Sequence, residues 1–355
     1  MQTSIPHIGE SDEVASDASL EANYRAVTSG GGIRLSDSGV ILMTGGESID
    51  FLNRLSTNDL SGMKAGQHRT TILTNEKGRV IDLVNIICRM SDLLLLVSPH
   101  NAPIVMEWLK KFIIMEEVSI QDVSMEYAGI EIFGPQVATG LRTFMGAEIR
   151  RKPGCWEEVS TDRGEALVMQ DPLWKGTKYL LIGFKEVIMP SWTRAITRSS
   201  SEAIQVIIPE VFESMRLERG IPIQGKELTL NVNPLEADLT EFVSFTKGCY
   251  IGQEVIARLD TYKKLQKKLT GFVFKEHKGE LLQLPIEVLF EGGEVGFVTS
   301  LSWSFHLERN IALGYVRTSI TADEVNLVSS TSSGRTVRAI LTSPSIVSPS
   351  NGTHG

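Results

Sequence analysis

The chain has 355 residues, of which 42% are hydrophobic and 22% are charged. Because domains commonly contain about 100 to 200 residues, this length and composition predict two or three packed domains and exclude a largely disordered protein. Lys and Arg total 35 and Asp and Glu total 43, which gives a net charge of −8. That balance argues against nucleic acid as a partner bound through bulk charge, although it allows a local basic patch.

The longest aliphatic runs are far shorter than the roughly 20 residues of a membrane-spanning helix, so no membrane partner is expected. The first thirty residues carry five acidic residues, one arginine and no apolar segment. Neither a secretory signal nor an Arg-rich transit peptide fits that pattern, and a cytoplasmic location is therefore the expectation.

Residues 1–32 are rich in Ser, Asp, Glu and Gly, and this composition predicts a flexible arm. From residue 33 to residue 267, strand and helix patterns alternate and include hairpins. This order indicates α+β modules rather than a parallel doubly wound sheet. We expect two such units, at about 33–155 and 156–267.

The helical pattern stops after Thr261. Six short strands separated by turn residues follow, which is typical of a small antiparallel barrel or sandwich. We predict a C-terminal β-barrel over 268–343 and a frayed tail over 344–355, which is rich in Ser, Pro and Gly.

The three cysteines, Cys88, Cys155 and Cys249, are widely spaced and form no CxxC pair. The six histidines show no ligand spacing either, so no disulfide framework and no metal site is expected. Cys249 lies just before a predicted helix start near Gly252 and two residues from Lys247. Both features favour a reactive thiolate. The alternative is a small buried hydrophobe in a turn.

The segment FTKGCYIGQEVIAR, Phe245 to Arg258, contains KGCYIGQE. This motif resembles the signature of the YgfZ family, folate-binding proteins that support iron-sulfur cluster assembly or repair. They are related to GcvT, the aminomethyltransferase (T-protein) of glycine cleavage. The blocks FLNRLSTNDL, TILTNEKGRVIDL, IFGPQVATGL, MRLERGIPIQGKEL and NPLEADL agree in order and spacing, and GEVGFVTSLSWS and NIALGYVR resemble the superfamily's C-terminal barrel.

The resemblance spans roughly residues 33–343 and implies a fold class. This is an α+β fold in which a GcvT-like folate-binding domain of two ferredoxin-like units surrounds a central cavity, followed by an antiparallel β-barrel. The implied cofactor is tetrahydrofolate or a one-carbon derivative of it.

The resemblance also implies site residues. The implied catalytic residues are Cys249 and Asp82, and the implied cofactor-binding residues are Asp82, Arg216, Glu218, Lys247, Tyr250 and Asn58. Asp82 would lie beside the reactive folate nitrogens and Arg216 would face the folate. From the residues alone, Asp82 also fits an exposed strand position, and Arg216 and Glu218 fit a solvated helix end.

Five basic residues crowd the segment that leaves the signature helix: Arg258, Lys263, Lys264, Lys267 and Lys268. They suit a polyglutamate tail, an acidic protein partner or RNA. The simpler interpretation is a solvated linker face.

The sequence departs from the aminomethyltransferases in DPLWKGTKYLLIG, Asp171 to Gly183, which lacks the glutamate that those enzymes carry near the pterin. We therefore expect a tetrahydrofolate-binding accessory protein for iron-sulfur clusters, whose partners are client or assembly proteins. The alternative is a folate-dependent aminomethyl or one-carbon transferase of the T-protein type. An interaction scaffold with a vestigial pocket is left open.

Overall fold

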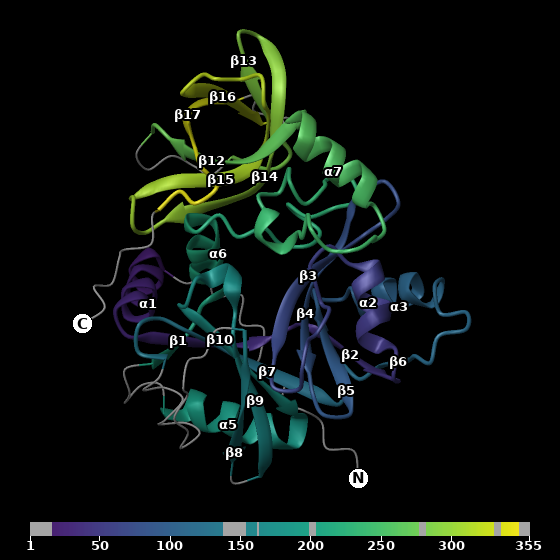
Figure 1. Cartoon of the computed structure of the whole chain (residues 1–355). Helices are drawn as coiled ribbons and strands as arrows, with labels where there is room; N and C mark the ends of the chain where they lie inside the picture. Colours follow the sequence, from purple (N-terminus) through teal and green to yellow (C-terminus); the bar gives the residue numbers. More distant parts are fainter. Residues whose placement is uncertain are drawn as a thin grey trace, which may run out of the picture.

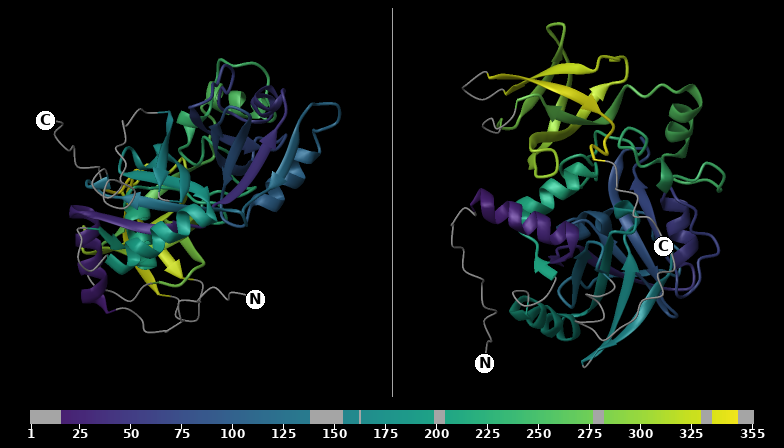
Figure 2. Two further views of the ribbon diagram at one scale, coloured as in Figure 1. Left: turned by 90° about the horizontal axis from the view of Figure 1, so that it is seen from below. Right: turned by 90° about the vertical axis from the view of Figure 1, so that its left-hand side faces the viewer.

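The computed structural model describes residues 16–137, 154–161, 163–198, 204–276, 282–329 and 335–347. Two β-sheets face each other in the body of the molecule, and a closed barrel packs at one end of this body (Figure 1). Figure 2 shows the same two parts from two further directions.

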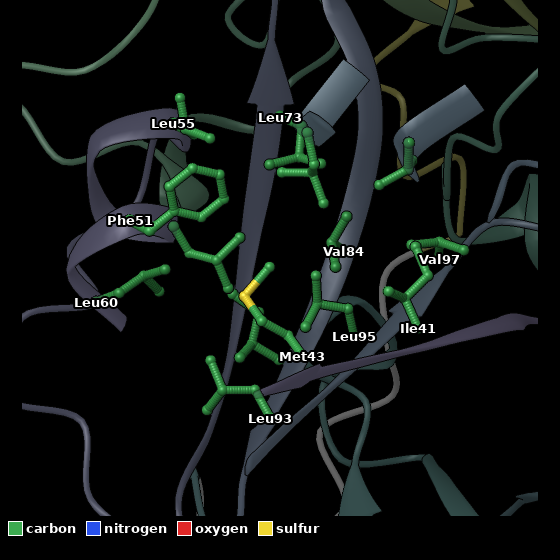
Figure 3. Close-up of a cluster of buried hydrophobic side chains, with 14 of the residues drawn as sticks. Ile41, Met43, Phe51, Leu55, Leu60, Leu73, Val84, Leu93, Leu95 and Val97 are labelled. Atoms are coloured by element: carbon green, nitrogen blue, oxygen red, sulfur yellow. The ribbon is translucent and has the colours of Figure 1, made fainter. Parts of the chain in front are cut away.

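The first sheet has five antiparallel strands in the order β3-β4-β5-β2-β6. Its strands are β2 (Gly39–Thr44), β3 (His68–Thr74), β4 (Val80–Cys88), β5 (Asp92–Val97) and β6 (Ser119–Asp122). Helices α2 (Ser48–Leu55) and α3 (Ala102–Lys110) cover its outer face. There Phe51 and Leu55 of α2 meet strand residues such as Met43, Val84 and Leu95 (Figure 3).

The second sheet has six strands in the order β11-β1-β7-β10-β9-β8. They are β1 (Gly31–Ser36), β7 (Tyr127–Phe133), β8 (Trp156–Thr161), β9 (Gly164–Gln170), β10 (Lys178–Phe184) and β11 (Ile204–Val206). Helix α5 (Lys185–Arg198) covers its outer face, and the short helix η1 (Pro172–Trp174) joins β9 to β10.

The strand partners correct the predicted unit boundary at residue 155. Strand β1 pairs with β7 and β11, and β7 pairs with β10, so strands from before and after this position share one sheet. The local strand pattern does not reveal this pairing, because it depends on contacts between residues far apart in the chain.

The N-terminal segment is also more ordered than predicted. Residues Asp17–Ser29 form helix α1, whose Tyr24 and Val27 are buried against helix α6 (Pro209–Glu218). Leu20, Tyr24 and Val27 follow helical spacing and give the segment an apolar stripe that its polar composition conceals. The predicted arm is therefore wrong for these residues, and residues 1–15 lie outside the described part.

The C-terminal part is a closed antiparallel barrel in the order β12-β15-β14-β13-β16-β17, as predicted. Its strands are β12 (Lys267–Phe274), β13 (Ile286–Phe290), β14 (Gly293–Ser304), β15 (Arg309–Arg317), β16 (Glu324–Ser329) and β17 (Thr336–Thr342). The short helix η2 (Thr240–Phe242) and helix α7 (Gln253–Tyr262) precede the barrel.

The start of the predicted tail is bound rather than frayed. The Val347 N–H donates to the Glu218 carbonyl at 2.8 Å, and Ile346 packs against the hydrophobic cluster between body and barrel. Residues 348–355 lie outside the described part.

One buried arginine joins α6 to the barrel. Arg216 donates from Nε and Nη2 to the two carboxylate oxygens of Glu213, at 2.9 and 2.6 Å. Its Nη1 donates to the Ile221 carbonyl at 2.6 Å and to Glu227 at 2.9 Å, and its Nη2 also donates to Ser300 Oγ of β14 at 2.8 Å. A guanidinium has five N–H donors, so all of them are used inside the protein.

Glu218 makes a second connection on the same helix. Its buried carboxylate accepts hydrogen bonds from Tyr24 Oη of α1 and from Ser304 Oγ of β14, each at 2.7 Å. Arg216 and Glu218 of α6 thus connect this helix to the barrel, and Glu218 also connects it to the N-terminal helix α1.

We predict that Arg216→Ala lowers the free energy of unfolding by about 3 to 5 kcal/mol, because it leaves the buried Glu227 carboxylate without its cation. Urea unfolding followed by circular dichroism measures this change. Arg258→Ala on the exposed side of α7 is the control and should change stability by less than about 0.5 kcal/mol. Equal effects of the two substitutions would contradict the role given to Arg216.

Candidate functional site

A cavity of about 950 Å³ lies between the inner faces of the two sheets and α6. Its wall is mainly apolar with a few charged groups, and includes Leu83, Asn85, Leu96, Glu131, Met169, Asp171, Trp174, Lys178, Phe212 and Lys226. The size and mixed lining fall in the range of small-molecule sites, which are about 300 to 1,000 Å³.

Charged side chains from three adjacent strands meet in the cavity wall. Lys178 Nζ lies 2.7 Å from Glu131 Oε1 and 3.0 Å from Asp171 Oδ2. Arg34, the cross-strand partner of Glu131, places Nε 3.3 Å from Glu131 Oε2, and its guanidinium lies 4.0 Å from the centre of the Phe212 ring. Strand alternation directs these side chains away from α5 and toward the inner face.

Ionic contacts favour the charged form of Lys178. Burial alone would lower the pKa of Lys178, but the carboxylates of Glu131 and Asp171 outweigh burial and raise it. Among the described residues, Glu131 Oε2 is a buried side-chain oxygen that accepts no hydrogen bond. Since Glu131 lines the cavity, this oxygen can accept an N–H group of a ligand.

A buried histidine lies near the same cluster. His68 begins β3, is 6% exposed, and has no hydrogen-bond partner on either ring nitrogen in the described part of the chain. Burial lowers its pKa, and the negative charge of Asp171 offsets only part of this effect. The imidazole is therefore held neutral.

We predict that His68 contributes an acid-sensitive part of the stability. Its pKa is lower in the folded protein than the ordinary value of about 6.5, so the unfolded chain binds the extra proton and stability falls as the pH drops below about 6.5. Urea unfolding at a series of pH values should show a smaller fall in His68→Leu than in the wild type. Identical pH profiles would contradict this prediction.

Asp82 lies inside the protein but does not line the cavity. Its side chain is fully buried and accepts hydrogen bonds from the Ser98 N–H at 3.0 Å, Ser98 Oγ at 2.5 Å and the Leu83 N–H at 2.8 Å. The next residue, Leu83, and Asn85 line the cavity instead. Asp82 thus ties β4 to the turn before α3. The alternative of an exposed strand position is therefore wrong, and the implied contact of Asp82 with folate stays a prediction.

Lys247 and Asn58 belong to a structural contact at the end of α2. Lys247 Nζ donates to the carbonyls of Asn53, Ser56 and Asn58 at 2.6, 2.7 and 2.6 Å, and burial lowers its pKa to about 8. A cation is favourable at this carboxyl end of a helix. The Asn58 side chain donates to the Thr70 carbonyl at 2.7 Å, and neither residue lines the cavity.

The remaining residues of the predicted site do not lie together in the structure. Cys249 is exposed ahead of α7 and outside the cavity wall, so it is not a buried hydrophobe. Tyr250 is buried in the core between body and barrel, and burial raises its pKa to about 12. Arg216 does line the cavity, but it has no free donor for a folate, and Glu218 lies in the joint with the barrel.

Sequence reasoning missed the charged cluster around Lys178. The signal was present, because Arg34 and Glu131 each stand alone among apolar residues in the strands GGIRLS and YAGIEIF. A single charge in the middle of a buried strand calls for a partner or a ligand.

Two family models match the chain. Residues 10–167 match the GCVT N-terminal domain, and residues 267–347 match the Glycine cleavage T-protein C-terminal barrel domain. These two segments of the chain are therefore similar to the N-terminal domain and the C-terminal barrel of the glycine cleavage T-protein. Aminomethyltransferase from Desulfitobacterium hafniense (strain DSM 10664 / DCB-2) is 27% identical over 307 residues, which are 84% of this chain and 82% of the relative. Aminomethyltransferase from Thermoanaerobacter sp. (strain X514) is 27% identical over 308 residues, with 84% and 81% covered.

The fold is similar to that of a solved aminomethyltransferase. The crystal structure of glycine cleavage system aminomethyltransferase T from Bartonella henselae matches with a TM-score of 0.80 and 18% identity, covering 94% of this chain and 91% of that chain. This match confirms the predicted GcvT-like fold class. No helix among the described residues is long and apolar enough to cross a membrane.

Proposed function

We propose that this protein binds tetrahydrofolate, or a one-carbon derivative of it, in the central cavity and transfers a one-carbon group in the manner of the aminomethyltransferases. The observation that supports this most directly is the buried Glu131 in the cavity wall, whose Oε2 lies 3.3 Å from Arg34 Nε and accepts no hydrogen bond among the described residues. A carboxylate in this state suits a flat heterocycle that carries N–H donors.

The rest of the cavity wall fits the parts of a folate. Leu96, Met169 and Phe212 offer apolar surface for a planar ring and an aromatic linker. Lys226, whose side chain is 45% exposed and whose Nζ lies 2.9 Å from Glu213 Oε1, also lines the cavity and suits an anionic glutamate tail. Tetrahydrofolate would supply the nitrogen atoms that carry the one-carbon unit.

The chain's own residues can supply electrostatic stabilisation. The carboxylates of Glu131 and Asp171 favour positive charge that develops beside them, and the protonated Lys178 keeps both in place. In this proposal the carboxylates of Glu131 and Asp171 have the electrostatic role that the resemblance implied for Asp82. The Asp82 carboxylate accepts hydrogen bonds from Ser98 instead.

We predict that Glu131→Gln weakens tetrahydrofolate binding by about ten- to one-hundred-fold, the usual effect of losing one charged hydrogen bond. Isothermal titration calorimetry under anaerobic conditions measures the affinity, and a thermal melt checks the fold of the variant. Glu107→Gln on the exposed side of α3 is the control and should bind like the wild type. An unchanged affinity in Glu131→Gln would reject the assignment of this carboxylate.

A second candidate function is the accessory role in iron-sulfur cluster assembly or repair. One observation favours it: Cys249 is exposed at the surface within KGCYIGQE, and Lys247 anchors this segment to the end of α2. A reaction confined to the cavity has no use for this thiol, whereas a reaction with client or assembly proteins needs an accessible one.

We predict that iodoacetamide labels Cys249 faster than the buried Cys88, and that tetrahydrofolate does not slow the labelling, because the thiol lies outside the cavity wall. Cys249→Ser should keep its folate affinity, with Cys88→Ser as the control. If the variant retains one-carbon transfer and restores iron-sulfur enzyme activity in a strain lacking the protein, the part given to the Cys249 thiol is rejected. If it transfers normally and fails to restore that activity, the accessory role is supported.

A further inference from the structure

Helix α7, the turn after it, the start of β12 and the end of β15 carry six basic residues in one region of the fold, which we name the α7–β12 surface. They are Arg258, Lys263, Lys264, Lys267, Lys268 and Arg317, and the pairing of Lys267 with Arg317 places the end of β15 next to the start of β12. In Figure 1 and in the right view of Figure 2, α7 lies at the outer edge of the molecule beside the barrel.

These cations have no carboxylate partners in the described part of the chain. None of the six forms an ion pair there, whereas the nearby Arg79 is held at 3.2 Å by Glu236. Burial lowers the pKa of Lys267, and the positive charge of Arg79 adds to this effect while Glu236 opposes it. Basic residues therefore outnumber the acidic Glu254 and Asp260 of α7 in this region of a protein whose net charge is −8.

Exposed aromatic rings lie among the cations. Tyr262 is 63% exposed at the end of α7, and Phe297 of β14 is 40% exposed. The ammonium of Lys264 lies 5.7 Å from the centre of the Tyr262 ring, and that of Lys267 lies 5.3 Å from the centre of the Phe297 ring. Arg258 precedes Tyr262 by one helical turn, so the two share a face of α7.

Cations together with exposed aromatic rings favour one class of polyanionic ligand over another. An acidic peptide would use the cations but would leave the exposed rings without a function. A single-stranded nucleic acid offers phosphates to the cations and base faces to the rings, which is how sequence-tolerant single-strand binders work. We propose that the α7–β12 surface binds single-stranded nucleic acid.

This surface is separate from the cavity. None of its six cations, nor Tyr262 or Phe297, belongs to the cavity wall, so the two sites can be tested independently. The negative net charge argues against a protein that coats nucleic acid. It does not decide whether this local basic surface binds a single strand. At physiological salt, the interaction between exposed charges is screened over about 8 Å, a distance shorter than a protein of this size.

The test uses the full chain and a fluorescein-labelled single-stranded RNA of mixed sequence, about 20 nucleotides long, in an anisotropy titration. Binding should weaken as salt rises from about 50 to 200 mM, with a log–log slope of about −0.7 for each phosphate contacted. The variant Tyr262→Ala should bind at least about five-fold more weakly, the effect of losing one stacked base.

The double variant Lys264→Gln/Lys268→Gln should make the salt slope shallower by about 1.4, which is two phosphate contacts. The double variant Lys110→Gln/Lys111→Gln, at the end of α3 on another surface, is the matched control and should bind like the wild type. Thermal melts and folate calorimetry should be unchanged in all variants, which separates a local effect from misfolding.

Two outcomes would overturn the proposal. The first is no RNA binding at the lower salt, or equal binding by all variants. The second is binding that Tyr262→Ala does not weaken and that a poly-glutamate peptide displaces at equal charge, which would assign the surface to an acidic protein. Loss of folate binding with intact RNA binding would count against the proposed function alone.

Discussion

The architecture depends on the buried guanidinium of Arg216. Helix α6 forms one wall of the cavity, and this side chain fixes the helix to Glu227 and to Ser300 of the barrel. A buried charge is tolerated only when its donors are all satisfied, so this contact requires one placement of the helix relative to the barrel. The shape of the cavity therefore depends on a domain that contributes none of the lining residues discussed above.

Positive and negative side chains also offset one another in the cavity wall. Lys178 joins two carboxylates, and Arg34 faces one of them, so two positive and two negative groups share one wall. This neutral arrangement is compatible with burial while it still leaves Glu131 Oε2 without a hydrogen bond. In the proposed function, folate is the ligand that this wall accommodates.

Local patterns predicted the barrel well, because alternation and turn residues are properties of neighbouring positions. The assignment of strands to the two sheets could not be predicted in the same way, since β1 pairs with β7 from a distant part of the chain. The motif residues raise a similar difficulty. In a sequence, a charge that binds a ligand and a charge that binds the chain itself look alike, and Asp82, Arg216 and Lys247 make internal contacts.

The pairing of β1 with β7 has a consequence for how the protein is made. During synthesis β1 leaves the ribosome first, but its antiparallel partner follows only after the whole five-stranded sheet, and its parallel partner β11 comes later still. The apolar Ile33 of β1 must therefore stay unpaired, or be held by another molecule, while the intervening chain emerges. The unpaired strand β1 can form non-native contacts during that interval. The dependence of the nascent protein on chaperones should therefore be greatest before β7 and β11 have been synthesised.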